Sequence, residues 1–232
     1  MVERMQIKSF DGKAFEALLN IPFRTPAPGI VMIPEMYGLT QPLKETAARF
    51  SEQGFVVALV DIFWRLGTSI VLGYDKAGSD QARVYHNAFD YDLGSKDVQS
   101  AVTQLRSRAE CNGRVGVVGY CLGGTVAYLA AARTDADASA GYYGTRIQNF
   151  LGDAANIKHP LMLHFGERDH TTPPEILRQI MPAIEDNGLV TTHVHPEAGH
   201  AFANHRRPDR YHAAATERAD TQTFELFRRT LA

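Results

Sequence analysis

The chain has 232 residues, of which 44% are hydrophobic, and its formal net charge at pH 7 is −2. This length and hydrophobic content suit one domain over residues 1–232 with a sizeable core. Nucleic-acid binding needs a surplus of basic residues, which this charge excludes. No apolar run is long enough to cross a bilayer, and the N-terminus lacks the apolar stretch of a signal peptide. With only two cysteines, these features predict a cytoplasmic protein without a membrane partner.

Hydrophobic periodicity divides the chain into alternating strands and helices. Asp11-Gly12 is a favoured tight-turn pair and predicts a hairpin. Short continuous apolar runs further along are typical of strands covered by helices on both faces. In chain order the predicted elements are a hairpin over 7–20, a strand over 30–33, a helix over 41–53, a strand over 55–60, an irregular segment over 64–78, helices over 79–91 and 95–109, a strand over 115–118, a helix over 122–132, strands over 138–143 and 161–165, a helix from 173, a strand over 190–195 and a helix over 211–231.

The alternation of strands and helices predicts an α/β protein with a doubly wound, mostly parallel sheet and an antiparallel N-terminal hairpin. In sheets of this kind, functional sites lie beyond the carboxyl ends of the strands. Residues able to carry chemistry are therefore expected on the loops that follow the predicted strands.

The strongest motif is the segment 119–124, Gly-Tyr-Cys-Leu-Gly-Gly, between a predicted strand and an Ala-rich helix. It has the Gly-x-nucleophile-x-Gly pattern of a nucleophile elbow, with Cys121 in place of serine. Side chains two positions either side of the nucleophile would collide with the backbone of so sharp a turn, which explains the glycines. The start of the following helix favours a thiolate, and the amide of Leu122 can donate into an oxyanion hole. The motifs of a phosphate loop and of a dinucleotide site do not fit.

An acid and a histidine follow the elbow, each on the loop after a predicted strand. Asp169 follows the strand over 161–165, and His200 follows the strand over 190–195. Nucleophile, acid, histidine is the chain order of α/β-hydrolases, in which the histidine transfers the proton and the acid orients it. The sequence therefore predicts a triad of Cys121, Asp169 and His200.

Other acids and histidines make weaker candidates. Three acids lie after other strands or in helices: Asp135, Asp137 and Asp153. His170 adjoins the predicted acid and is interpreted as a loop residue. His193 and His195 share one face of a strand and resemble half of a zinc site, but the other ligands would have to be His200 or carboxylates. Histidines serve packing more often, so we expect no metal and no cofactor.

Together these segments resemble the dienelactone hydrolase family over nearly the whole chain. The resemblance is carried by residues 34–38, 61–65, 116–124, 141–144, 166–169 and 199–202. It implies that Glu35 is the family's site glutamate, which interacts with the resting thiol and exchanges partners when substrate arrives. It also implies that the amides of Met36 and Leu122 form the oxyanion hole and that Tyr142 lines the pocket.

The resemblance fails at the two arginines with which the family holds a substrate carboxylate. Ser79 and Asn204 stand at those positions, and Arg83 stands where the family has a tyrosine. Either Arg83 or Arg206 could reach the pocket as a replacement, but a changed substrate is the simpler expectation. We expect the catalytic residues to carry over and the carboxylate clamp to be lost.

The sequence thus predicts a cysteine-nucleophile hydrolase that opens a small ester or lactone through a thioester, on a substrate other than the namesake dienelactone. One alternative is a broad-specificity carboxylesterase or thioesterase. A second, of another class, is a non-catalytic ligand-binding relative, which the complete triad disfavours.

Overall fold

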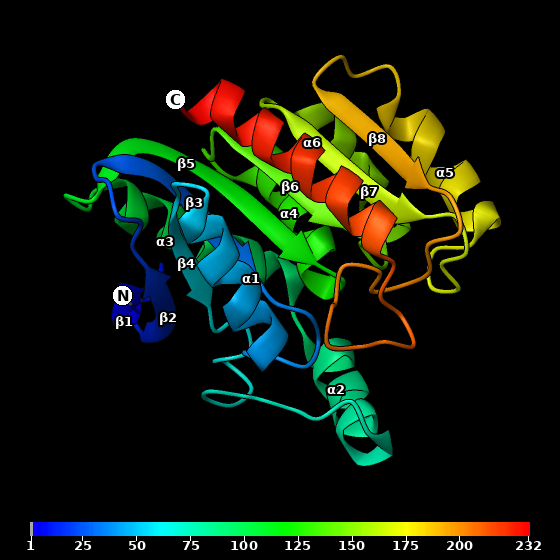
Figure 1. Cartoon of the computed structure of the whole chain (residues 1–232), viewed down its shortest axis with the longest axis horizontal. Coiled ribbons are helices and arrows are strands. Elements are labelled where there is room, and N and C mark those ends of the chain that lie inside the picture. Colours follow the sequence, from blue (N-terminus) through cyan, green and yellow to red (C-terminus); the bar gives the residue numbers. More distant parts are fainter. Residues whose placement is uncertain (1) are drawn as a thin grey trace.

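One eight-stranded sheet runs through the computed structural model, which describes residues 2–232 (Figure 1). The strands are β1 (Val2–Lys8), β2 (Ala14–Asn20), β3 (Ala27–Ile33), β4 (Val56–Val60), β5 (Cys111–Tyr120), β6 (Ala138–Tyr142), β7 (Leu161–Gly166) and β8 (Val190–His195). Their order across the sheet is β1-β2-β4-β3-β5-β6-β7-β8. The pairs β1–β2 and β2–β4 are antiparallel and all others are parallel. The predicted α/β class, with its antiparallel N-terminal hairpin, is confirmed.

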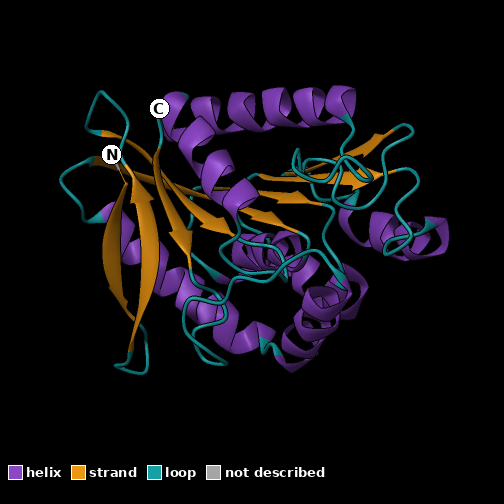
Figure 2. Ribbon diagram, turned by 60° about the horizontal axis from the view of Figure 1, so that its bottom comes forward, coloured by secondary structure: helices purple, strands orange, loops and turns teal. Residues whose placement is uncertain are grey.

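Helices cover both faces of the sheet (Figure 2). They are α1 (Gln41–Glu52), α2 (Lys76–Ala88), α3 (Tyr91–Arg106), α4 (Leu122–Arg133), α5 (Pro174–Ile184), α6 (Ala213–Leu231) and a 3₁₀ helix, η1 (Ile147–Asn156). In Figure 1, α1 and α6 lie in front of the sheet and α3 and α4 lie behind it. No helix within residues 2–232 has both the length and the apolar character required to cross a membrane.

The residues of β3 show why the central strands consist of continuous apolar runs. Ile30 and Met32 belong to the hydrophobic cluster beneath α1 and α6, whereas Val31 and Ile33 belong to the cluster beneath α3 and α4. All four are fully buried. Because successive side chains of a strand point to opposite faces, a strand covered on both sides must be apolar throughout.

Two helices begin earlier than the sequence predicted, because aspartates cap them. Asp75 accepts a hydrogen bond from the amide of Gly78 at 2.7 Å, so α2 starts within the segment interpreted as irregular. Asp90 accepts from the amides of Asp92 and Leu93 at 2.9 Å and separates α2 from α3. Such caps satisfy amides that have no partner inside the helix.

Candidate active site

Cys121 lies on the sharp turn between β5 and α4 that the glycine pattern predicts. Its backbone angles are φ 57° and ψ −115°, outside the regions that residues with a side chain ordinarily adopt. A Cβ atom on Gly119 would lie 1.9 Å from the carbonyl oxygen of Gly123. A Cβ atom on Gly123 would lie 2.5 Å from the carbonyl oxygen of Ile33. The two glycines therefore allow the backbone contacts that hold this turn in place.

Asp169 and His200 meet beside this turn on the loops after β7 and β8. Oδ2 of Asp169 lies 2.8 Å from Nδ1 of His200. Thr171 donates its hydroxyl to Oδ1 of Asp169 at 2.6 Å, and its oxygen lies 2.8 Å from Nδ1 of His200. Because the threonine proton goes to the carboxylate, its oxygen can only accept, so Nδ1 carries the ring proton. Nε2 is then the ring nitrogen left for a thiol.

Neighbouring charges and hydrogen bonds set the pKa values of His200 and Asp169. Burial alone would lower the pKa of His200, but the charge of the Cys121 thiolate and the hydrogen bond with Asp169 raise the pKa of His200 to about 10. Burial acts to raise the pKa of Asp169, yet its hydrogen bonds with His200 and Thr171 bring that pKa below its ordinary value. A protonated His200 ring beside the ionised carboxylate of Asp169 is therefore favoured at neutral pH.

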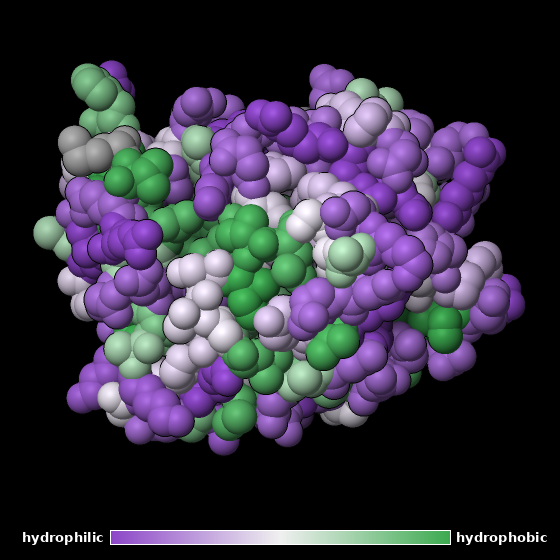
Figure 3. All heavy atoms as spheres, turned by 90° about the horizontal axis from the view of Figure 1, so that it is seen from below, coloured by the Kyte–Doolittle hydropathy of each residue, from purple (hydrophilic) through white to green (hydrophobic). Residues whose placement is uncertain are grey.

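A cavity of about 300 Å³ brings the thiol, the imidazole and a buried carboxyl group together. It lies where the parallel strands end. Figure 3 shows the molecule from below the view of Figure 1, with apolar residues gathered in the middle of that face. The residues that line it are Glu35, Met36, Tyr37, Ser79, Arg83, His86, Cys121, Thr145, His170, Thr171, His200, Ala201, Arg207 and Arg210. The cavity thus contains Cys121, His200, Glu35 and Met36 from the sequence prediction, with Asp169 hydrogen-bonded behind the histidine.

The amides of Met36 and Leu122, predicted to bind an oxyanion, are both free to donate. Neither amide makes a hydrogen bond to a backbone or side-chain acceptor within residues 2–232. Leu122 is the first residue of α4, where amides have no partner inside the helix. The two amides are therefore the kind of donors that an oxyanion hole requires.

Two residues expected in the pocket lie behind it. Tyr142 is fully buried and donates its hydroxyl to Asp220 at 3.0 Å, because its side chain points from the end of β6 toward α6. The neighbouring Tyr143 instead packs its ring against His200, with centroids 5.2 Å apart. Asn204 is also buried and donates to Oε1 of Glu35 at 3.1 Å. The expectations that Tyr142 and Asn204 line the pocket are therefore corrected.

One face of α2 forms a wall of the cavity. Ser79, Arg83 and His86 recur at helical spacing and all line it. Ser79 shares a hydrogen bond of 3.2 Å with the Tyr37 hydroxyl, and Arg83 pairs with Asp80 at 2.7 Å. Burial and neighbouring positive charge lower the pKa of His86 to about 4, so its imidazole is neutral.

The loop after β8 supplies arginines that the sequence analysis did not select. Arg206, the candidate replacement, turns outward and binds Glu45. Arg207 and Arg210 line the cavity instead, and both contact Asp209, at 2.8 and 3.3 Å. The only signal in the sequence was that both arginines follow His200 on the same loop.

The remaining candidates lie outside the cavity or carry no ligand geometry. Asp135, Asp137 and Asp153 bind arginines elsewhere on the surface. On β8, His195 shares a 3.1 Å hydrogen bond with His164, and the His193 ring stacks on His164. Within residues 2–232, no group of three or more histidines, cysteines or acids could hold a metal ion.

A larger cavity of about 710 Å³ lies at the N-terminal edge of the sheet. It is lined by the loop around Phe23, the start of β3 and the end of α1, at the opposite end of β3 and β5 from the elbow. None of Cys121, Asp169 and His200 reaches it. Size alone therefore does not identify the chemical site, and the smaller cavity is the candidate.

Comparisons with known proteins identify the family of the chain. The model of the dienelactone hydrolase family matches residues 15–231. The chain is 35% identical over 204 residues to a carboxymethylenebutenolidase of Pseudomonas putida, covering 88% of this chain and 86% of that protein. It is 34% identical over 223 residues to carboxymethylenebutenolidase 1 of Cupriavidus pinatubonensis, covering 96% and 94%.

Solved structures share the fold at lower identity. A dienelactone hydrolase-like promiscuous phosphotriesterase from metagenomic libraries superposes with a TM-score of 0.82 at 23% identity, over 100% of this chain and 99% of that chain. The dienelactone hydrolase of Anabaena variabilis superposes with a TM-score of 0.73 at 18% identity, over 100% and 99%.

The sheet order, the elbow and the residues gathered beyond the strand ends define an α/β-hydrolase. Within that class, the family model and the two curated relatives show that the chain belongs to the dienelactone hydrolase family. It is a carboxylic ester hydrolase.

Proposed function

We propose that this enzyme opens small esters or lactones with Cys121 as its nucleophile, Asp169 and His200 completing the triad. The single observation that carries the proposal is the meeting, in one cavity, of a thiol on a strained turn with an imidazole whose Nδ1 is bound to a buried carboxylate. A positioned base, an orienting acid and a nucleophile on a helix start are what covalent acyl transfer requires.

In the first half-reaction, the Cys121 thiolate attacks the ester carbonyl, and the amides of Met36 and Leu122 stabilise the oxyanion. The carbon–oxygen bond to the leaving alkoxide then breaks, and the His200 imidazolium gives it a proton from Nε2. In the second half-reaction, neutral His200 removes a proton from water, which attacks the thioester. The thiolate leaves, the imidazolium is restored and the carboxylic acid product departs.

For the substrate, we propose a neutral ester or lactone rather than the namesake dienelactone. Ser79 and Asn204 stand where the family has the arginines that hold a substrate carboxylate, and the Asn204 amide is already hydrogen-bonded to Glu35. The arginines in the cavity are already paired, Arg83 with Asp80 and both Arg207 and Arg210 with Asp209. Pairing reduces what these arginines can contribute to a substrate carboxylate, because an anion must compete with the aspartates.

Cavity size favours this function over a broad-specificity esterase or thioesterase. A space of about 300 Å³ fits a small ring, whereas a long acyl chain would have to extend out of it into solvent. Turnover itself separates an enzyme from the ligand-binding alternative. A panel of p-nitrophenyl esters, thioesters and simple lactones separates the enzymatic alternatives by relative kcat/KM.

The experiment that tests the nucleophile compares the two cysteines. Cys121→Ala should abolish hydrolysis of a p-nitrophenyl ester and of a simple lactone. Cys111→Ala is the matched control, because Cys111 is buried at the start of β5 and its thiol faces the carbonyl of Arg114. We expect this control to retain nearly the wild-type rate. Retention of the wild-type rate by Cys121→Ala would refute the mechanism.

A further inference from the structure

Asn204 has all its polar atoms engaged inside the protein. Its Nδ2 donates to Oε1 of Glu35 at 3.1 Å and to the hydroxyl of Tyr74 at 2.9 Å. Its Oδ1 accepts from the backbone amide of Arg206 at 3.2 Å. Because a backbone amide can only donate, this last bond fixes which side of the Asn204 amide is nitrogen. The side chain is buried and absent from the cavity lining, so it does not meet substrate.

The Glu35 carboxyl group relies on the Asn204 amide for its side-chain hydrogen bonding. Glu35 is 3% exposed, and the bond from Asn204 is the only hydrogen bond of its carboxyl group within the described residues. No arginine or lysine of that part of the chain lies within ion-pair distance of it. A buried carboxyl group without such a partner is costly to ionise. Burial accordingly raises the pKa of Glu35, and the charge of His200 and the bond from Asn204 only partly offset the rise.

We propose that Asn204 is a positioning residue, which fixes the Glu35 carboxyl group beside the Cys121–His200 pair and acts on the thiol through it. The inference rests on the proposed function, in which Cys121 is the nucleophile. An amide can hold the carboxyl group in place without adding a charge that would keep it ionised. Burial favours the protonated form of the carboxyl group, so a change in its charge can be felt by the neighbouring thiol.

The groups that titrate or carry charge around Glu35 come from several elements and must be considered together. They are Cys121 and His200 in the cavity, Arg207 on the loop after β8, Tyr74 before α2, and the buried Tyr120 and Tyr143. Burial and the charge of Glu35 hold the pKa of Tyr143 above the ordinary range, so this hydroxyl stays protonated. Glu35 is therefore the carboxyl group beside the thiol whose pKa burial raises, so its charge can change as the pH is raised from acid.

The test measures the rate of alkylation of Cys121 by iodoacetamide as a function of pH, without substrate and in a Cys111→Ala background. Wild type should show an inflection that is absent in Glu35→Gln. Asn204→Ala should move this inflection to higher pH by about 0.5–1 unit, since it removes a hydrogen bond that favours the ionised carboxylate. In the Glu35→Gln background, Asn204→Ala should leave the profile unchanged.

Two controls separate positioning from a general loss of structure. Asn204→Ser keeps a short donor in the buried space and should move the inflection in the same direction, by less. Tyr74→Phe removes the other partner of the Asn204 amide and keeps the bond to Glu35. This variant should move the inflection least. Steady-state kinetics add a second readout: positioning lowers kcat with KM nearly unchanged, whereas a substrate contact would raise KM. Far-UV circular dichroism confirms that each variant is folded.

The inference is overturned if Asn204→Ala changes the profile equally in the presence of Glu35 and in the Glu35→Gln background, or if the inflection does not move. It is also overturned if Glu35→Gln leaves the wild-type profile intact. These outcomes are distinct from failure of the proposed function, which is read from hydrolysis by Cys121→Ala. Alkylation reports on the thiol whether or not that thiol performs the turnover.

Discussion

Asp169 and His200 lie 31 positions apart in the chain, and Oδ2 of the first lies 2.8 Å from Nδ1 of the second. This bond joins the loops after two adjacent parallel strands, β7 and β8. It holds the ring proton on Nδ1, so that Nε2 can serve the thiol. The orientation of the His200 ring therefore depends on Oδ2 of Asp169.

Replacing Asp169 by asparagine should therefore disable the base without removing it. An amide in this place can turn its NH₂ group toward Nδ1 and favour the wrong tautomer. We expect kcat to fall by roughly 10⁴-fold, and His200→Ala to be at least as severe. Asp153→Asn is a suitable control, because Asp153 binds Arg133 on the surface. A loss below tenfold in His200→Ala would point to a different base.

Thr171 should contribute measurably to catalysis although it transfers no proton. Thr171→Val removes the hydroxyl that donates to Asp169 and keeps the shape of the side chain. A hydrogen bond to a charged group is worth about 1.5–3 kcal/mol, so we expect kcat to fall by roughly ten- to a hundredfold. Thr172→Val is the matched control in the same loop, since Thr172 binds the carbonyl of Gly144. Equal effects of both variants would contradict the assignment.

The charge of the preferred substrate should differ from that of the family's namesake dienelactone. We expect kcat/KM for a neutral lactone to exceed that for a carboxylate-bearing dienelactone of similar size. The alternative result is a strong preference for the dienelactone that is lost in Arg207→Gln or Arg210→Gln. That result would show that the clamp moved to the loop after β8. Arg206→Gln serves as the control, because this side chain binds Glu45 outside the cavity.

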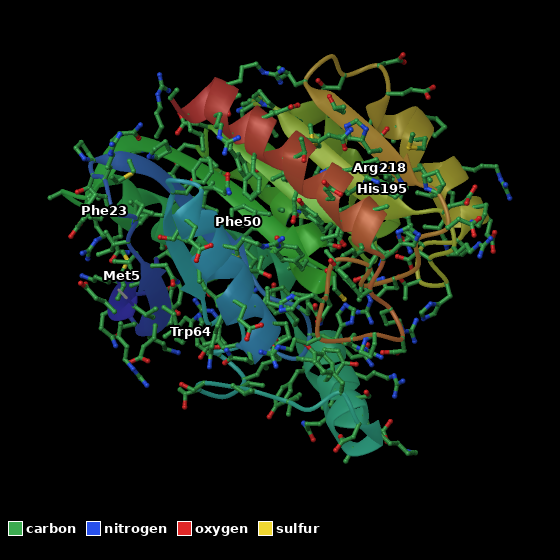
Figure 4. All side chains as sticks on the ribbon, viewed as in Figure 1. Met5, Phe23, Phe50, Trp64, His195 and Arg218 are labelled. Atoms are coloured by element: carbon green, nitrogen blue, oxygen red, sulfur yellow. The ribbon has the colours of Figure 1, made fainter. Side chains whose placement is uncertain are left out.

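Mild acid should destabilise the folded protein, because three of its histidines are buried as neutral rings. Burial lowers the pKa of His86 and of His195 to about 4, and it holds the pKa of His164 well below its ordinary value. His195 also lies beside Arg218, whose charge contributes (Figure 4). Between pH 6.5 and 4 the unfolded chain takes up protons that the folded chain refuses. The free energy of unfolding therefore falls as pH falls through this window.

Urea unfolding at pH 7, 6 and 5 measures this dependence. Each such histidine contributes up to about 1.4 kcal/mol per pH unit within the window. His195→Gln should make the dependence on pH shallower, since one titrating ring is removed. An unchanged slope would mean that His195 takes up its proton in the folded state as readily as in the unfolded chain.

The elbow should tolerate no side chain at position 119. Gly119→Ala places a Cβ atom 1.9 Å from the backbone oxygen of Gly123, which cannot turn aside as a side chain could. We expect the free energy of unfolding to fall by about 3 kcal/mol or more. Gly152→Ala is the control, because nothing lies within 4 Å of its added Cβ atom, and it should change stability by less than about 0.5 kcal/mol.

The sequence predicts the elements that follow from local pattern. The continuous apolar runs indicated the strands, and the glycines around Cys121 indicated the turn, because both constraints act over a few residues. Asp75 and Asp90 are equally local signals, and their capping role was missed. The directions in which the side chains of Tyr142 and Arg207 point do not follow from local pattern. Whether such side chains face the cavity depends on how α6 and the loop after β8 pack, which no local pattern encodes.

The loop after β8 carries His200, Asn204, Arg207 and Arg210 within one short stretch, whereas α2 carries Ser79, Arg83 and His86. Any insertion in the loop would shift the base, the residue that holds Glu35 and part of the cavity wall together. Substitutions on the exposed helix α2 change the wall and leave the base where it is. Divergence toward new substrates should therefore be accessible through α2, and selection in the laboratory for altered specificity should begin there.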